Sequence, residues 1–127
     1  MHSARRRASS GAALVAVFGM IGGCATTQSR FVFLDEHYPP QAADAAVDVY
    51  RNALPSRTFK RIARLDVHLE KSGFMTSRFE EALPELKKQA RQAGADAIVE
   101  IEEKHSRILE TMVYHVTATG VRYTSSP

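Results

Sequence analysis

Hydrophobic and polar positions alternate along much of the second half of the chain, which is typical of strands that have one face on a core. In residues 58–71 the odd positions are mostly apolar and the even positions are mostly polar. The same period of two recurs in residues 96–103 and 108–123, and a shorter alternating segment spans residues 46–51. The pattern therefore predicts four strands in this part of the chain.

One segment between these strands has the spacing of an amphipathic helix instead. Its apolar stripe comprises Leu83, Leu86, Ala90 and Ala93. Ser77 with Glu80 three residues later predicts a capping box at the start of the helix, and Gly94 predicts a left-handed C-cap at its end. Pro84 predicts a kink or a restart after the first turn, because its ring excludes one helical hydrogen bond.

The order of these elements, β-β-α-β-β, predicts an α+β fold: a two-layer sandwich with one kinked amphipathic helix on a small twisted sheet. We expect residues 45–124 to form this single domain. In residues 96–103 the apolar odd positions should face the helix. Leu86 should then be buried against a core made of Leu65, Val67, Val99 and Val116.

The first 23 residues have the three parts of an export signal: a basic patch, an apolar stretch over residues 11–23, and small residues at the end. That stretch is shorter than the about 20 residues that a membrane-spanning helix requires. Its four glycines, at positions 11, 19, 22 and 23, disfavour a permanent helix. We therefore prefer a removed signal peptide, residues 1–23, to an uncleaved anchor or a buried core helix.

The segment Ile21-Gly22-Gly23-Cys24 resembles the bacterial lipobox. The resemblance implies cleavage between Gly23 and Cys24, a diacylglycerol thioether on the Cys24 sulfur, and an acyl chain such as palmitate on the new amino group. Two or three acyl chains anchor a protein stably, whereas one holds it marginally. Because Cys24 is the only cysteine, the mature domain can form no internal disulfide.

Ala25 follows the modified cysteine, and in enteric bacteria a residue other than Asp there resembles the default for sorting to the outer membrane. We therefore expect a lipoprotein of the bacterial cell envelope, lipid-anchored to the periplasmic face of the outer membrane, although the inner membrane remains an alternative. Residues 24–44 are interpreted as a lipid-anchored tether. Within it, residues 31–34 should form a short strand or latch on the domain, and residues 38–40 a stiff spacer in preference to a docking motif.

Charge excludes nucleic acid as a partner. The net charge is +3, but Arg5, Arg6 and Arg7 are the only charged residues before Cys24. Removing residues 1–23 leaves 14 basic and 14 acidic side chains, with no basic stripe that could follow a phosphate backbone. The 44% hydrophobic content is enough for one modest core.

One group of residues could carry metal chemistry. If the register is right, His68, Glu100, Glu102 and His115 project from the sheet face opposite the helix, where imidazoles and carboxylates could hold Zn²⁺ or Cu²⁺. The alternative, which we prefer, is an ordinary solvated face. Strands two apart would separate the imidazoles by roughly 10 Å, so only adjacent strands would bring them together. We predict that no transition metal binds tightly.

The segment LPELKKQARQAGADAIVEI, residues 83–101, followed by TATGVRY, resembles the helix–GADA–strand core of small bacterial envelope proteins. These include the sensor lipoprotein of the Rcs stress phosphorelay and the putative heavy-metal-binding (YbjQ-like) family. The resemblance implies a role in envelope stress sensing or metal binding.

The chain has no nucleophile elbow, HExxH helix or phosphate loop, so we expect no enzyme and no cofactor. A tethered domain without catalytic groups acts by presenting a surface. We therefore expect a non-catalytic interaction module that binds an envelope protein or a second copy of itself, with metal binding by the open sheet face as the alternative.

Overall fold

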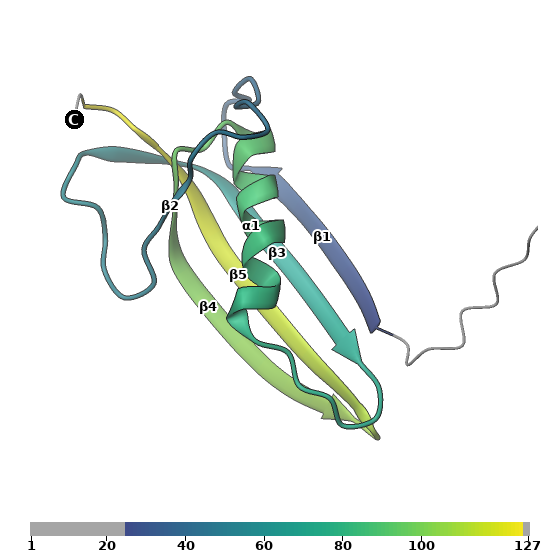
Figure 1. Ribbon diagram of the computed structural model, residues 1–127. Coiled ribbons are helices and arrows are strands. Elements are labelled where there is room, and N and C mark those ends of the chain that lie inside the picture. The colour runs from purple at the N-terminus through teal and green to yellow at the C-terminus, as the bar shows by residue number, and fades with distance from the viewer. Residues whose placement is uncertain (1–24, 126–127) are drawn as a thin grey trace, which may run out of the picture.

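The computed structural model describes residues 25–125 (Figure 1). The predicted signal peptide and the lipidation site at Cys24 lie outside the described residues. Within that range no helix is both long enough and apolar enough to cross a membrane.

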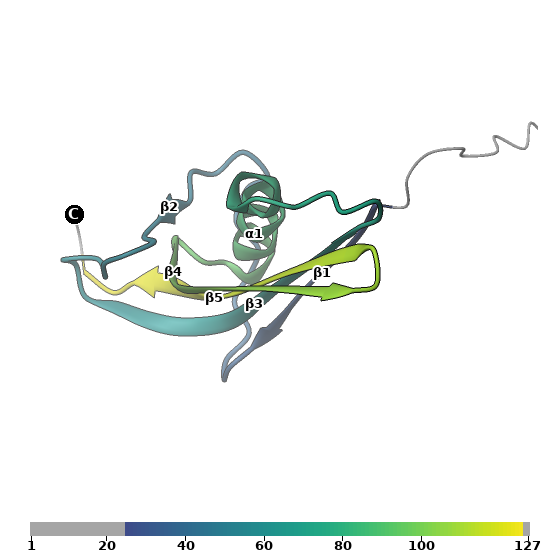
Figure 2. The same cartoon turned by 90° about the horizontal axis from the view of Figure 1, so that it is seen from below.

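The molecule is an α+β fold in which one helix packs on a five-stranded mixed sheet. Its elements are β1 (Ala25–Phe33), β2 (Asp48–Val49), β3 (Phe59–Lys71), α1 (Phe79–Ala93), β4 (Ala97–Ile108) and β5 (Thr111–Tyr123). The strand order is β1-β3-β5-β4-β2, with β2 parallel to β4 and the other neighbours antiparallel. From β2 onward the predicted order β-β-α-β-β is confirmed, and Figure 2 shows α1 over one face of the sheet.

Strand β1 corrects the prediction of a tether over residues 24–44. It pairs along β3 from Ala25, opposite Lys71, to Phe33, opposite Ala63. Sequence patterning did not predict most of this strand, because an edge strand exposes polar side chains to water and lacks an apolar alternation. The expected strand at residues 31–34 is confirmed for the part that lies in β1.

The segment after β1 also packs on the domain, so the prediction of a stiff spacer at residues 38–40 that lifts the domain off the lipid is wrong. The backbone N–H of Gln41 donates to the Arg91 carbonyl at 2.7 Å. A side chain at Gly94 would lie only 2.6 Å from the Pro39 carbonyl oxygen. Glycine is therefore required at position 94 twice, by this close approach and by its φ of 80°.

The two ends of α1 differ in how well sequence predicted them. At the C-terminus Gly94 adopts the expected left-handed conformation, and Ala95 N–H donates to the Ala90 carbonyl at 2.8 Å, as in a Schellman motif. At the N-terminus the capping box is wrong. The helix begins after Arg78, which makes no side-chain cap, and the buried Ser77 hydroxyl has no partner among the described residues.

Pro84 lies inside one continuous helix, so the predicted restart is also wrong. The acidic residues Glu80 and Glu81 occupy the first turn, where they interact favourably with the positive end of the helix dipole. Together with the Lys71–Glu81 ion pair of 2.6 Å, they stabilise a helix start that lacks a side-chain cap.

The main core lies between α1 and the sheet. Its fully buried members include Leu65, Val67, Leu86, Ile98 and Val116. The expected burial of Leu86 is confirmed, but Val99 is not part of this core. The register of β4 against β5 shifts between Val99 and Glu102, and this bulge reverses the alternation.

Before the bulge, therefore, Ile98 faces α1, while Ala97 and Val99 face away. A second, smaller cluster forms there on the opposite sheet face, from Ala97, Val99, Val121, Tyr50, Phe59 and Tyr123. Hydrophobic alternation with a period of two could not predict this reversal of side-chain direction, because it assumes uninterrupted pairing between β4 and β5.

Candidate functional site

The sheet face turned away from α1 carries the candidate site. On β3 the even positions from Arg64 to Glu70 are partly or fully exposed, whereas the odd positions from Ala63 to Leu69 are buried. On β5 the corresponding, partly exposed positions include His115 and Thr117. Apart from the small second cluster, the side chains on this open face are therefore mainly polar.

At its centre the two predicted histidines meet. His68 on β3 is the direct cross-strand partner of His115 on β5, and their ring centroids are 5.6 Å apart in an edge-on arrangement. The strands are adjacent, which is the one arrangement that brings the imidazoles together. The objection that they would lie two strands apart therefore no longer applies.

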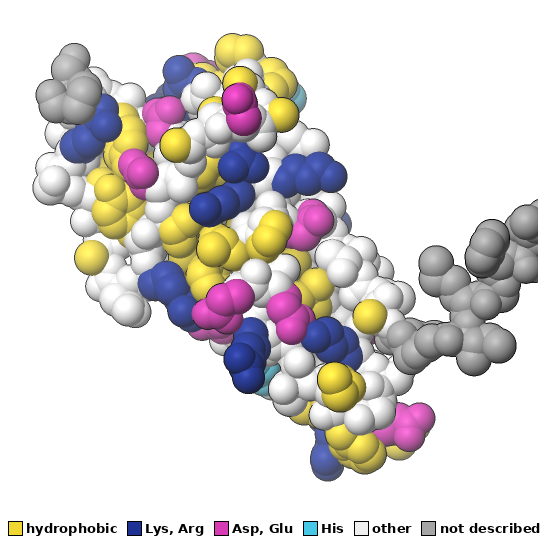
Figure 3. Space-filling view, in the orientation of Figure 1, with side chains coloured by type: hydrophobic (Ala, Val, Ile, Leu, Met, Phe, Trp, Pro, Cys, Tyr) yellow, Lys and Arg dark blue, Asp and Glu magenta, His cyan; other side chains and the backbone are white. Residues whose placement is uncertain are grey.

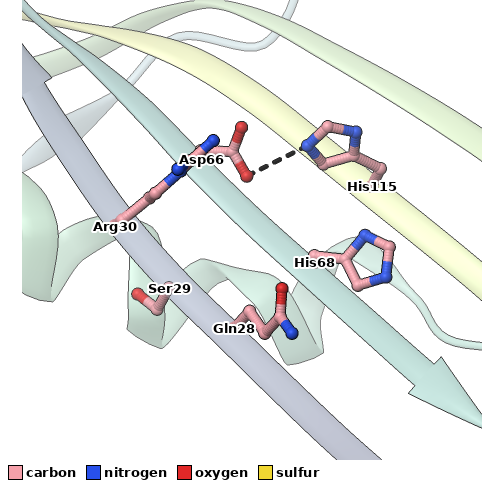
Figure 4. A pocket seen from close by; sticks show the side chains of 6 residues that line it. All are labelled: Gln28, Ser29, Arg30, Asp66, His68 and His115. Carbon is pink, nitrogen blue, oxygen red and sulfur yellow. Dashed lines mark hydrogen bonds and ion pairs between the residues drawn. The ribbon is translucent and has the colours of Figure 1, made fainter.

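Each imidazole is already bound to a carboxylate. Nε2 of His115 lies 3.0 Å from Oδ1 of Asp66 (Figure 4). Nε2 of His68 lies 2.9 Å from Oε1 of Glu70. Sequence reasoning did not include these two acids in the site. The signal was present, because Asp66, His68 and Glu70 alternate along one strand and so share one face.

The two glutamates predicted for the site are separated by the bulge in β4. Glu102 pairs with Thr117 and lines a hollow beside His115, close to the histidine pair. Glu100 lies in the bulge with a φ of 52°, and its carboxylate accepts from Arg61 Nε at 2.7 Å. Glu100 therefore pairs with Arg61 and does not join the histidine pair.

The Arg61 guanidinium determines the behaviour of the Glu100 carboxyl. Its hydrogen bond and its positive charge hold the pKa of Glu100 below the usual range. About half of each side chain remains in water, so this ion pair contributes little to stability and weakens with salt.

His115 lines three neighbouring hollows of the open face. The first is bounded by β1 through Gln28 and Arg30 and by Asp66 (Figure 4). The others extend toward β4 and are bounded by Lys104 in both cases. Because cations, carboxylates and imidazoles alternate around His115, the face can bind a polar partner of mixed charge.

The donors on this face do not fit a tight heavy-metal site. Among residues 25–125 no group of three or more His, Cys, Asp or Glu side chains is placed to hold one ion. Zn²⁺ takes three or four protein ligands. Here the nearest approach is two imidazoles, and the Nε2 atom of each already contacts a carboxylate.

Tyr114 shows the chemistry of the opposite face. Its ring is almost fully buried, and its hydroxyl donates to Glu103, which also pairs with Arg51 at 2.9 Å. Burial first, and the neighbouring carboxylate second, raise the pKa of Tyr114 above its ordinary range. This phenol therefore remains neutral and acts as a structural hydrogen-bond donor.

Comparison with known proteins gives a family match for part of the chain. No curated protein matches it, and no solved structure matches it. One family model does match, over residues 69–123, and its description is "Putative heavy-metal-binding". The match includes His115 and begins one residue after His68. Residues 69–123, from the end of β3 through β5, are thus similar to the YbjQ-like family.

Proposed function

We propose that the protein is a non-catalytic binding module of the bacterial cell envelope, anchored by lipid on Cys24 at the periplasmic face of the outer membrane. The ordered basic, apolar and lipobox parts of the first 24 residues support the anchor. Its partner is another envelope protein, in keeping with a role in envelope stress sensing.

The observation that carries this proposal is the open sheet face. The single helix covers only one side of a five-stranded sheet. On the other side, basic and acidic side chains line the hollows around His115. Polar side chains arranged on a rigid sheet give a partner both orientation and specificity. The hollows open onto the surface of the sheet, where a charge-complementary protein surface can contact several of them at once.

Site-specific photo-cross-linking in the native envelope tests the proposal. A photoreactive residue replaces Thr117, at the centre of the open face, and in a control protein replaces Lys88, which is exposed on α1. We expect one discrete adduct from position 117 and none from position 88. Equal labelling from both positions would contradict the assignment of the binding face, and an adduct of doubled mass would identify a second copy as the partner.

Metal binding is the second candidate, and the cross-strand contact of His68 with His115 favours it. The description of the matched family adds support. Because only two imidazoles converge, we still predict no one-to-one binding of Zn²⁺ or Cu²⁺ at micromolar strength. Isothermal titration of Zn²⁺ and of Cu²⁺ into the wild type and into the His68→Ala/His115→Ala double variant tests this prediction. Tight binding that the double variant loses would favour the metal candidate over the interaction module.

A further inference from the structure

Four large hydrophobic side chains are exposed together at one end of the molecule. The exposed fractions are 61% for Phe74, 61% for Met75, 66% for Ile108 and 88% for Leu109. The β3–α1 loop and the β4–β5 turn meet there, because Phe74 N–H donates to the Glu110 carbonyl at 2.9 Å. Figure 3 shows hydrophobic side chains gathered at this end. We call these four residues the apical patch.

The backbone of the apical patch is not optimised for stability. Phe74 has a φ of 60° and Leu109 a φ of 55°, in the left-handed region that bulky L residues avoid. Glycine or asparagine is the usual choice in such turns. A large apolar side chain that is both strained and exposed contributes little to the core and is available for contact with something outside the domain.

The apical patch lies at the end of the molecule where the lipid would be attached. Ala25 pairs with Lys71, the last residue of β3, and the loop that carries Phe74 follows directly. Cys24 is bonded to Ala25, and neighbouring Cα atoms are about 3.8 Å apart. In Figure 1 the start of β1 and the β4–β5 turn lie at the same end of the sheet.

We infer that the apical patch is a second, non-covalent membrane contact that inserts into the phospholipid interface beside the lipidated Cys24. This inference rests on the lipid anchor proposed above. Exposed apolar side chains gain free energy when they leave water for the acyl boundary. Arg107, whose guanidinium lies 5.8 Å from the Phe74 ring, can reach the lipid phosphates. The contact would direct the long axis of the sheet away from the membrane.

Tryptophan quenching tests the inference directly, because the chain contains no tryptophan. Leu109→Trp probes the patch. Leu54→Trp is the matched control: Leu54 is also an exposed leucine, at 53%, but it precedes Phe59 at the opposite end of β3. Thirteen strand residues separate the two ends by roughly 40 Å. Both full-length variants are purified from membranes and reconstituted in phosphatidylethanolamine–phosphatidylglycerol vesicles with and without brominated acyl chains.

We expect the fluorescence of Trp at position 109 to fall severalfold in brominated vesicles and that of Trp at position 54 to be unchanged. Equal quenching at both positions, or none at position 109, would overturn the inference. So would a blue shift without quenching, which would place a second copy on the patch.

The mass of Cys24 in the same samples separates the two proposals. An unmodified Cys24 with strong quenching at position 109 would overturn the lipid anchor and support the patch. A lipidated Cys24 without quenching at position 109 would support the lipid anchor and overturn the membrane contact of the patch. Thermal melts of both variants against the wild type establish that each is folded.

Discussion

Gln89 is a buried polar residue that links α1 to the strand that carries Asp66 and His68. It is 2% exposed, and its side-chain amide bonds both backbone groups of Asp66: Oε1 accepts from the N–H at 3.0 Å, and Nε2 donates to the carbonyl at 2.7 Å. Nε2 also donates to Ser29 Oγ on β1 at 2.6 Å. One side chain thus fixes the strand position from which Asp66 contacts His115.

Replacing this glutamine tests that role. Gln89→Leu keeps a similar volume but leaves the Asp66 backbone groups without their partners, so we expect a loss of about 1–3 kcal/mol in the free energy of unfolding. Urea denaturation measures it. Gln92→Leu, at an exposed position one turn along, is the control. Equal stabilities of the two variants would mean that the buried hydrogen bonds of Gln89 contribute nothing net.

The ion pair between Arg61 and Glu100 predicts a measurable pKa change. Because Arg61 lowers the pKa of Glu100, Arg61→Ala should raise that pKa toward its ordinary value, and side-chain carbon NMR across an acid titration reads it. The folded-state pKa lies below the unfolded one, so the pair stabilises the fold above the unfolded pKa, and this contribution is lost as pH falls through the folded pKa. An unchanged Glu100 titration in the variant would contradict the assigned cause.

At the scale of elements, hydrophobic period predicted the parts of the chain whose burial is one-sided. Strands β3 and β5 and the apolar stripe of α1 were all recognisable, because each alternates between water and core. Strand β1 was missed because its outer edge and most of its side chains remain exposed. The bulge in β4 has no signature in composition, so the facing of Val99 was predicted wrongly.

The helical phase of α1 gives a test at this scale. Leu86 is fully buried in the main core, so Leu86→Ala should cost about 2–5 kcal/mol, through lost apolar burial and the cavity left behind. Lys88→Ala, two positions along on the exposed side, should change stability by less than about 0.5 kcal/mol. Chemical denaturation of both variants measures the difference, and similar losses would contradict the packing of α1 on the sheet.

At the scale of the whole molecule, the candidate site was predictable in content but not in arrangement. Alternation assigned His68 and His115 to one face, but the order of strands, which makes them neighbours, depends on pairing between distant segments. The carboxylate partners Asp66 and Glu70 share the same alternation in β3, but sequence reasoning did not include them. The apical patch was not predictable, because exposure of Leu109 depends on how two loops meet.

The anchoring of the whole molecule provides the last prediction. If the Cys24 sulfur accepts the diacylglycerol, Cys24→Ser removes the only thiol that can do so, and cleavage before residue 24 should then fail as well. We expect an unprocessed precursor of higher mass than the wild-type polypeptide, found by mass spectrometry of the membrane fraction. The control is Ser29→Ala, since Ser29 lies in β1 beyond the signal segment and its loss should leave processing intact. A wild-type protein with an unmodified Cys24 would contradict the lipid anchor. Without that anchor, the apical patch would be the remaining proposed contact between the domain and the membrane.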